Sequence, residues 1–269
     1  MSTGIRRSRR NLIKLGVIAG SAALAGCKHS AAGGGNGQGG NGQDGAQCFL
    51  KGTNIRTVEG DRKIEDLSPG DLLPTVFGGI CPIQWIGRYV LTKSDPTKAW
   101  VKKVLPVRIA RSALGLDVPC ADLCVTKKHA LLIDGVLVTA GSLINGTTIT
   151  VYDPRELDEL EFFHIKLERH NAIFAQGAAC ETLRKVEESA GNFAQYLLDH
   201  GHLTTQEAPC APVLSCIGGR REIRSRFRSA IAPWIDCRQQ VDIIRDELEE
   251  RGIAVLRDRN SSRDCRVFA

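Results

Sequence analysis

Residues 55–73 read IRTVEGDRKIEDLSPGDLL, and residues 131–149 follow the same pattern as LLIDGVLVTAGSLINGTTI, with one inserted residue. Val58-Glu59-Gly60 aligns with Ile133-Asp134-Gly135, and Leu67-Ser68-Pro69-Gly70 aligns with Leu143-Ile144-Asn145-Gly146. Each copy predicts a hairpin whose glycine supplies a positive-φ turn position, followed by a second turn and another strand. The duplication therefore predicts two similar β units packed about a pseudo-two-fold axis.

The residues around the two copies have the same β character. From residue 48 onward, short apolar runs alternate with Gly, Pro and acidic-Gly pairs, a texture typical of all-β domains. Cys48 stands at the start of the first strand-like run, and Thr126 and His129 form a T-x-x-H motif just before the second copy. In a pseudo-symmetric pair the starts of both copies can meet at the centre, which would bring Thr126 and His129 beside Cys48.

Six segments, in order, carry a family resemblance. They are CFLKGT at 48–53, DLSPGDLL at 66–73, IQWIGR at 83–88, PVRIARSALG at 106–115, VTKKHALLI at 125–133 and HNAIFAQGAACET at 170–182. Together they resemble a bacterial Hedgehog/intein (Hint) domain spanning residues 48–182. The resemblance implies a mainly β, horseshoe-shaped fold of two pseudo-symmetric halves, and a reaction of the domain on its own peptide bond.

The resemblance implies that Cys48 attacks the Gln47-Cys48 peptide bond by an N-to-S acyl shift, because a cysteine thiolate is a good nucleophile and the thioester remains reactive. His129 would protonate the departing amide nitrogen, and Thr126 would hydrogen-bond the scissile amide. His164 and His170 are candidate helpers in the second acyl transfer. We expect no cofactor and no metal ion at this site.

Full splicing is not expected. Splicing inteins end in His-Asn followed by a nucleophile, whereas this chain has Ala179-Cys180-Glu181-Thr182 at the corresponding place, and Asn171 lies too early. The thioester should therefore be resolved by cleavage or ligation, with water or a small or protein nucleophile and the chain's own N-terminal segment as substrate. The alternative is a catalytically inactive, lipid-anchored surface protein that uses the fold as a binding scaffold.

The N-terminal residues have the pattern of an export signal. Residues 8–14, SRRNLIK, resemble a twin-arginine export signal, and Leu24-Ala25-Gly26-Cys27 resembles a bacterial lipobox in which Cys27 is lipidated. We expect residues 1–27 to be the export signal and 28–47 a Gly-rich linker. The protein would then lie in the periplasm or cell envelope, held to a membrane by a lipid anchor. A hydrophobic N-terminal helix that stays uncleaved is the alternative.

Charge and cysteine content limit the possible partners. Five of the 36 basic residues precede residue 27, where no acid occurs, so 31 basic side chains face 30 acidic ones in the remainder. That balance argues against nucleic-acid binding, which needs a basic face. Apart from Cys27 and Cys48, eight cysteines remain, which permits disulfides in an exported chain. Zinc is a competing use for Cys120, Cys124, Cys210 and Cys216.

Residues 183–269 change in periodicity and predict a mostly helical extension. Apolar residues fall at helical spacing in ETLRKVEESAGNFAQYLLDHG at 181–201 and in RQQVDIIRDELEERG at 238–252, where Gly252 is expected to end the helix. Between them an arginine-rich segment is expected to form an amphipathic helix, with Arg220, Arg221, Arg224, Arg226 and Arg228 around Ile223 and Phe227. This helix either contacts anionic head groups or presents a solvated face that pairs with acids near Glu247.

Overall fold

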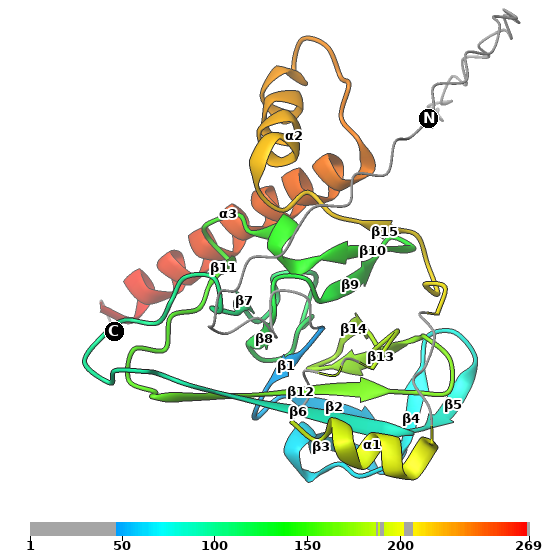
Figure 1. The fold of residues 1–269 in the computed structure, drawn as a ribbon. Helices are drawn as coiled ribbons and strands as arrows, with labels where there is room; N and C mark the ends of the chain where they lie inside the picture. The colour runs from blue at the N-terminus through cyan, green and yellow to red at the C-terminus, as the bar shows by residue number, and fades with distance from the viewer. Residues whose placement is uncertain (1–46, 187, 189–190, 202–206, 268–269) are drawn as a thin grey trace, which may run out of the picture. The chain divides into compact units, whose positions relative to one another are not determined.

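The computed structural model describes residues 47–186, 188, 191–201 and 207–267, and side chains only as far as residue 257 (Figure 1). The described residues belong to one compact unit. The predicted export signal, the lipidation residue Cys27 and nearly all of the predicted linker lie outside the described residues.

The first sheet holds the beginning of the described chain between strands from distant parts of the sequence. Its six strands are all antiparallel to their neighbours. In spatial order they are β11 (Ile149–Val151), β7 (Val107–Ile109), β8 (Leu123–Val125), β1 (Phe49–Leu50), β12 (Glu159–Lys166) and β6 (Trp85–Thr92). The two-residue strand β1 is therefore paired on both sides.

The second sheet contains the two hairpins that the duplication predicts. Its main path runs β15 (Val213–Leu214), β10 (Val136–Thr139), β9 (Ala130–Ile133), β14 (Ala178–Glu181), β13 (Ala172–Ala175), β2 (Asn54–Thr57) and β3 (Gly60–Lys63). Strand β4 (Leu72–Thr75) pairs with β13 and with β5 (Gly79–Pro82). Only β10 and β15 are parallel among these pairs.

Both copies of the duplicated stretch have the same order of elements. The hairpin β2–β3 is followed by a 3-10 turn at Ile64–Asp66 and then β4, and the hairpin β9–β10 is followed by a 3-10 turn at Ala140–Leu143 and then β11. In the second hairpin Asp134 and Gly135 both have positive φ, as a two-residue turn between twisted strands requires. The predicted mainly β fold of two related halves with a helical extension is confirmed.

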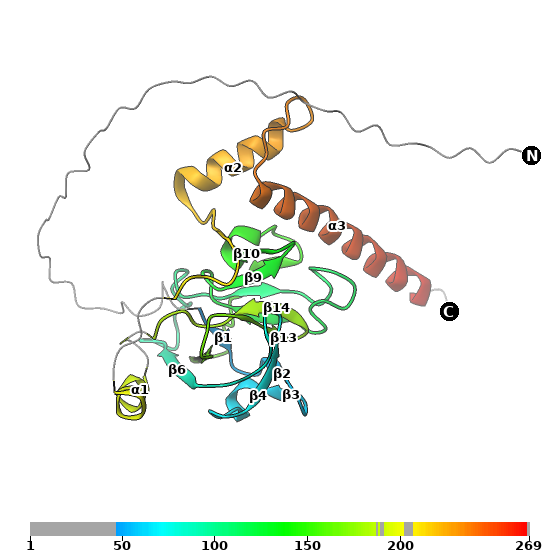
Figure 2. The same ribbon diagram turned by 90° about the vertical axis from the view of Figure 1, so that its right-hand side faces the viewer.

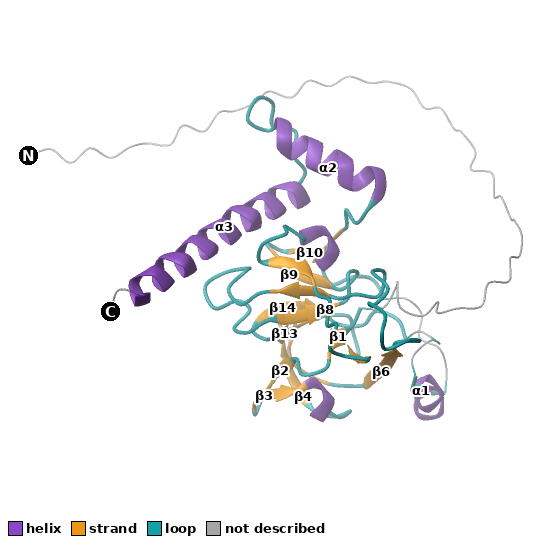
Figure 3. Cartoon of the chain, turned by 90° about the vertical axis from the view of Figure 1, so that its left-hand side faces the viewer, coloured by secondary structure: helices purple, strands orange, loops and turns teal. Residues whose placement is uncertain are grey.

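The described residues form three α-helices, α1 (Phe193–His200), α2 (Gly219–Ile231) and α3 (Gln240–Val267), and α1 lies apart from the other two (Figure 3). Helix α3 joins the main core, because Val241, Ile244 and Leu248 are buried in the same apolar cluster as Phe49 and Phe163. Helix α1 joins a second cluster, which contains Cys48, Trp85 and Tyr196.

The helix expected at 181–201 is shorter than its periodicity predicts. Glu181 ends β14, and Leu183 donates its N–H to the carbonyl of Ile165 on β12 (2.8 Å). Because Leu183 and Val186 are also buried in the second cluster, they keep this part of the chain against the sheet, and α1 begins only at Phe193. Apolar spacing here reflects burial against β12 rather than a helix face.

Gly252 does not end its helix, because α3 continues through it to Val267. The reason is close packing: a Cβ atom at this position would lie 2.6 Å from Oγ1 of Thr147 and 2.9 Å from Oγ1 of Thr148. The loop that contains Asn145 donates an amide N–H to the carbonyl of Leu248 (3.3 Å), which fixes this approach. The glycine is needed for helix-to-loop contact and not for a left-handed C-cap.

We expect Gly252→Leu to lower the free energy of unfolding by about 1–3 kcal/mol, because overpacking forces Thr147 and Thr148 apart from the helix. The matched control is Ala254→Leu on the exposed side of the same helix, which should change stability by less than about 0.5 kcal/mol. Urea unfolding followed by circular dichroism measures both. Equal stability of the two variants would contradict the close packing.

Candidate functional site

The register of β1 places Cys48 between two of the predicted partners. Phe49 pairs with Phe163 on β12 and with Val125 on β8. Because both pairs are antiparallel, the residue before Phe49 comes opposite the residues that follow Phe163 and Val125. Those residues are His164 and Thr126, so the site follows directly from the strand pairing.

Cys48 makes contacts through its backbone and its thiol. Its N–H, which is the nitrogen of the Gln47-Cys48 peptide, donates to Oγ1 of Thr126 (3.1 Å). The N–H of Thr126 donates to the carbonyl of Cys48 (3.0 Å). The Sγ atom lies 3.3 Å from Nδ1 of His164. Thr126 therefore holds the amide nitrogen of this peptide, and His164 lies against the sulfur.

His164 sits in an aromatic enclosure. Its ring stacks near Trp85 at a centroid distance of 6.0 Å and meets Tyr89 edge-on at 4.7 Å. Gly87 lies opposite His164 in the strand pair, and a Cβ there would fall 2.2 Å from Cδ2 of His164. Gly87 thus makes room for the imidazole. The IQWIGR segment contains this glycine, but the sequence gives no sign that its small size serves His164.

His129 lies on the other side of β1 from the thiol contact. It precedes β9, donates its backbone N–H to the carbonyl of Thr126 (3.1 Å) and meets the ring of Phe49 edge-on at 4.3 Å. Both ring nitrogens are buried without a hydrogen-bond partner among the described residues. Burial is the main cause of the lowered pKa of both His129 and His164, and the backbone of Gln47 is one of the smaller influences that oppose it in each case, so both imidazoles lie near this residue.

Burial decides the charge of both histidines. It lowers the pKa of His129 to about 4, against the carboxylate of Glu181, which raises it. It lowers the pKa of His164 to about 3, and a proton on His129 would lower it further. Both imidazoles are therefore neutral at neutral pH, which leaves each able to accept a proton.

His170 is not in direct contact with Cys48 within the described residues. Its Nε2 lies 3.4 Å from Oε2 of Glu181, and its Nδ1 accepts the N–H of Cys210 (2.9 Å). Oε1 of Glu181 accepts the N–H of Ala130, next to His129 (2.8 Å). One oxygen of the buried Glu181 carboxylate therefore faces His170, and the other faces the backbone next to His129.

Glu181 is a residue that sequence reasoning did not assign. The AACET segment lacks the asparagine of a splicing intein, but its acidic side chain is buried next to two histidines. An acidic residue inside a short run of small buried residues was the available signal. The carboxylate of Glu181 favours protonated His129, although burial outweighs this effect and lowers the pKa of His129 overall.

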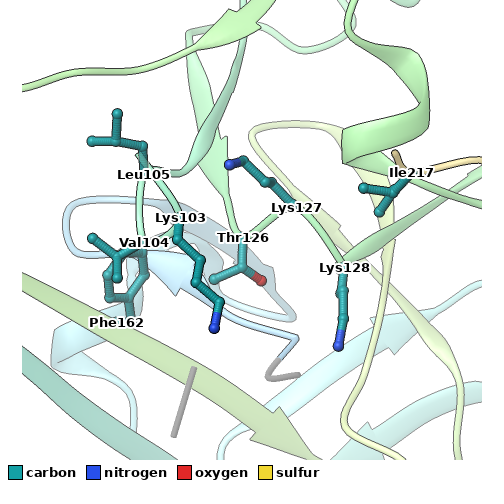
Figure 4. Close-up of a pocket in the computed structure, with 8 residues that line it drawn as sticks. All are labelled: Lys103, Val104, Leu105, Thr126, Lys127, Lys128, Phe162 and Ile217. Carbon is teal, nitrogen blue, oxygen red and sulfur yellow. The ribbon is translucent and has the colours of Figure 1, made fainter. Parts of the chain in front are cut away.

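A cavity of about 260 Å³ opens beside Thr126. The residues that line this cavity are Lys103, Val104, Leu105, Thr126, Lys127, Lys128, Phe162 and Ile217. Figure 4 shows Thr126 among the lysine side chains, with Val104, Leu105 and Phe162 on one side and Ile217 on the other. Burial lowers the pKa of Lys127, whose Nζ donates to the carbonyl of Lys102 (2.9 Å). The cavity is a basic opening next to the residue that holds the Cys48 nitrogen.

No disulfide joins any two of the cysteines whose side chains are described, and Cys265 lies beyond them. Within the described part of the chain, no three His, Cys, Asp or Glu side chains gather as a metal site would require. Burial raises the pKa of Cys124 to about 12 and that of Cys180 above its usual range. Among the described helices, none has the length and apolar character that crossing a membrane demands.

Comparison with known proteins places this geometry in a family. A family model described as the Hint domain matches residues 47–187, just over half of the chain. No curated protein matches the chain.

Among solved structures, the chain is similar to the gp41-1 intein, with 15% identity over 50% of this chain and 98% of that one and a TM-score of 0.35. For a DnaB intein from Synechocystis sp. PCC 6803 the identity is 12%, the coverage 51% and 99%, and the TM-score 0.33. A bacterial intein-like domain from Clostridium thermocellum gives 14% identity, 51% and 99% coverage and a TM-score of 0.35.

The low pKa values predict that the histidines destabilise the fold in acid. The unfolded chain binds protons at His129 and His164 near the ordinary histidine pKa of about 6.5, whereas the folded protein binds them only near 4 and 3. The free energy of unfolding should therefore fall as the pH drops below about 6.5. For each histidine the loss is about 1.4 kcal/mol per pH unit until the pH reaches the pKa of that histidine in the folded protein. His164→Gln in a Cys48→Ala background should weaken this fall in urea unfolding, while His200→Gln should not. An equal acid dependence in both variants would contradict the assignment.

Proposed function

This chain belongs to the Hint-domain family, whose fold is of the autoprocessing type, and we propose that Cys48 converts the Gln47-Cys48 peptide bond into a thioester. The observation that carries the proposal is the double contact of Cys48, its amide nitrogen on Thr126 and its sulfur beside His164. An acyl shift needs both atoms under control, because one leaves the carbonyl carbon as the other bonds to it.

In the proposed step, Sγ of Cys48 bonds to the carbonyl carbon of Gln47, and the bond from that carbon to the Cys48 nitrogen breaks. Neutral His164 accepts the thiol proton, since its Nδ1 lies 3.3 Å from Sγ. In the net step the thiol proton reaches the departing nitrogen: His164 passes it to His129, which donates it, so both imidazoles end neutral and Cys48 carries a free amine. Thr126 stabilises the nitrogen as it becomes tetrahedral, because its Oγ1 already bonds the N–H.

Burial of His129 and His164 supports this role. A neutral imidazole can act as the initial base, and a histidine that is hard to protonate releases its proton readily to the leaving nitrogen. The carboxylate of Glu181 raises the pKa of His129 and so eases its transient protonation. We assign His170 a supporting position behind Glu181, from which it helps the second transfer by fixing that carboxylate.

We propose that the reaction ends in cleavage or ligation. Water would give a carboxylate at Gln47 and a free Cys48, and an amine would give a new amide with the upstream segment. Asn171, the asparagine nearest the end of the domain, is held by Phe77, whose N–H donates to Oδ1 of Asn171 (3.0 Å). Asn171 directly precedes β13, and its side chain is used to bind the backbone at Phe77. This structural role supports an outcome without asparagine cyclisation.

The proposed setting is the cell envelope. With a twin-arginine signal before it and a lipid on Cys27, cleavage before Cys48 would release the domain from its membrane anchor, and an amine nucleophile would receive a lipopeptide. The rival function is an inactive lipid-anchored scaffold. The observation that favours the rival is that Cys48 is only 1% exposed, which shields its thiol from partners in solution.

Intact mass spectrometry separates the two functions. For a chain starting at Ser30, incubated with dithiothreitol, we expect a product that begins at Cys48, since a thiol resolves the thioester. Cys48→Ala should abolish it, and Thr126→Val or His129→Ala should slow it by about 10²-fold or more. The matched control is Cys180→Ala, a second buried cysteine, which should leave cleavage intact. An unchanged mass over days would favour the scaffold.

The lysines of the cavity predict a preference for anionic nucleophiles. Once the thioester forms, 2-mercaptoethanesulfonate should resolve it faster than cationic cysteamine, by about three- to tenfold after correction for their rates with a small reference thioester. Lys103→Gln with Lys128→Gln should remove this preference, and Lys98→Gln with Arg155→Gln should keep it. Rates from mass spectrometry that are indifferent to thiol charge would exclude the cavity as the entry path.

A further inference from the structure

Helix α2 has its polar side inward. Ser225 is fully buried and donates to Asp242 of α3, and Arg228 Nε donates to the same carboxylate (2.6 Å). Arg245 of α3 donates to Oγ of Ser225 (2.5 Å) and to Oγ of Ser229 (2.8 Å). Helices α2 and α3 pack against each other (Figure 2), and the hydrogen bonds between them are made by hydroxyls, arginines and a carboxylate. An ordinary surface helix would place its apolar stripe there.

The apolar side of α2 faces outward. We call it the α2 outer face, defined by Ile223 and Phe227 on the helix and Trp234 and Ile235 just after it, with Arg220 and Arg224 beside them. The four apolar side chains are 69%, 62%, 81% and 70% exposed. Large exposed apolar groups gathered within one short segment mark an interaction surface.

The charge of the α2 outer face identifies its partner. Both arginines are exposed, and neither forms an ion pair with a carboxylate of the described residues. The acid on α2, Glu222, accepts the N–H of Gly218 (3.0 Å) and lies at the start of the helix. Arg228 of α2, which points into the α3 contact, is neutralised by Asp242. The outer face therefore carries positive charge interleaved with aromatic and aliphatic groups.

We propose that the α2 outer face lies on an anionic lipid surface. A helix with apolar residues flanked by arginines lies in the plane of the interface, where arginines meet lipid phosphates and apolar groups enter the acyl boundary. Tryptophan is the side chain that favours this depth, because its ring is amphipathic. With 13 residues, α2 has the length for such a parallel placement. The inference does not depend on whether Cys48 is catalytic.

Trp234 is a built-in reporter for the test. The protein has three tryptophans, and the other two, Trp85 and Trp100, are buried. Fluorescence that acrylamide can quench therefore comes from Trp234. The full chain is used with Cys27→Ser, so that no lipid is attached, and is mixed with vesicles of phosphatidylcholine alone or with phosphatidylglycerol. Lipids brominated along the acyl chains report insertion of the ring.

With phosphatidylglycerol present, we expect acrylamide quenching to fall, bromolipid quenching to appear and both effects to weaken with salt. Arg220→Gln with Arg224→Gln should reduce this docking by about 30-fold, at about fivefold per charge. The matched control removes two exposed cations elsewhere, with Lys98→Gln and Arg155→Gln, and should dock as the parent does. Trp234→Phe should remove the signal.

Two results would overturn the proposal. If Trp234 stays equally open to acrylamide while the chain is bound to vesicles through another segment, the α2 outer face does not contact lipid. If Trp234 becomes protected without vesicles as protein concentration rises, the face joins a second copy or another protein surface.

Discussion

The site depends on one constraint: β1 is only two residues long and is hydrogen-bonded on both sides. Its pairing with β12 and β8 sets Cys48 opposite His164 and Thr126 at the same time. A shift of one residue in either pair would turn every side chain of β1 to the other face and separate the sulfur from its imidazole. Phe49 is buried in the main core and fixes this register, so the geometry of the site depends on the packing of the core.

Burial then sets the chemistry of the site. Cys48 belongs to one apolar cluster and Phe49 to the other, so β1 lies where the two cores meet. An imidazole placed there stays neutral, because the surroundings cannot solvate its charge. Glu181 offsets part of this effect at His129, and no carboxylate does so at His164. The two histidines therefore differ in how readily they take a proton, which fits the opposite roles that we propose for them.

Much of this could be predicted from the sequence, because duplication and segment order are properties of the chain itself. The two hairpins, the mainly β fold and the nearness of Thr126 to Cys48 follow from the duplication and the resemblance. His164 is expected only as a helper in the second acyl transfer, and its contact with the Cys48 sulfur is known only from the structure. Glu181, Gly87 and Gly252 could not be predicted, since their roles depend on which distant atoms approach them: an imidazole for Glu181 and Gly87, and two threonine hydroxyls for Gly252. The spacing of apolar residues indicates which face of a segment is buried, but it does not indicate which other element packs on that face.

The extension shows how far this limit reaches. The segment between α1 and α2 adds β15 to the edge of the second sheet. In the same segment Ile217 packs onto Gly141, where a Cβ would lie 2.9 Å from it, and lines the cavity beside Thr126. Helix α3 completes the main core, so the extension is part of the folded domain and of its opening. Helix α2 alone keeps its apolar side outward, because a network of serine, arginine and aspartate holds its inner side. Burial of these polar groups together with exposure of Phe227 and Trp234 is the pattern of a binding surface, which fits the proposed contact of this face with lipid.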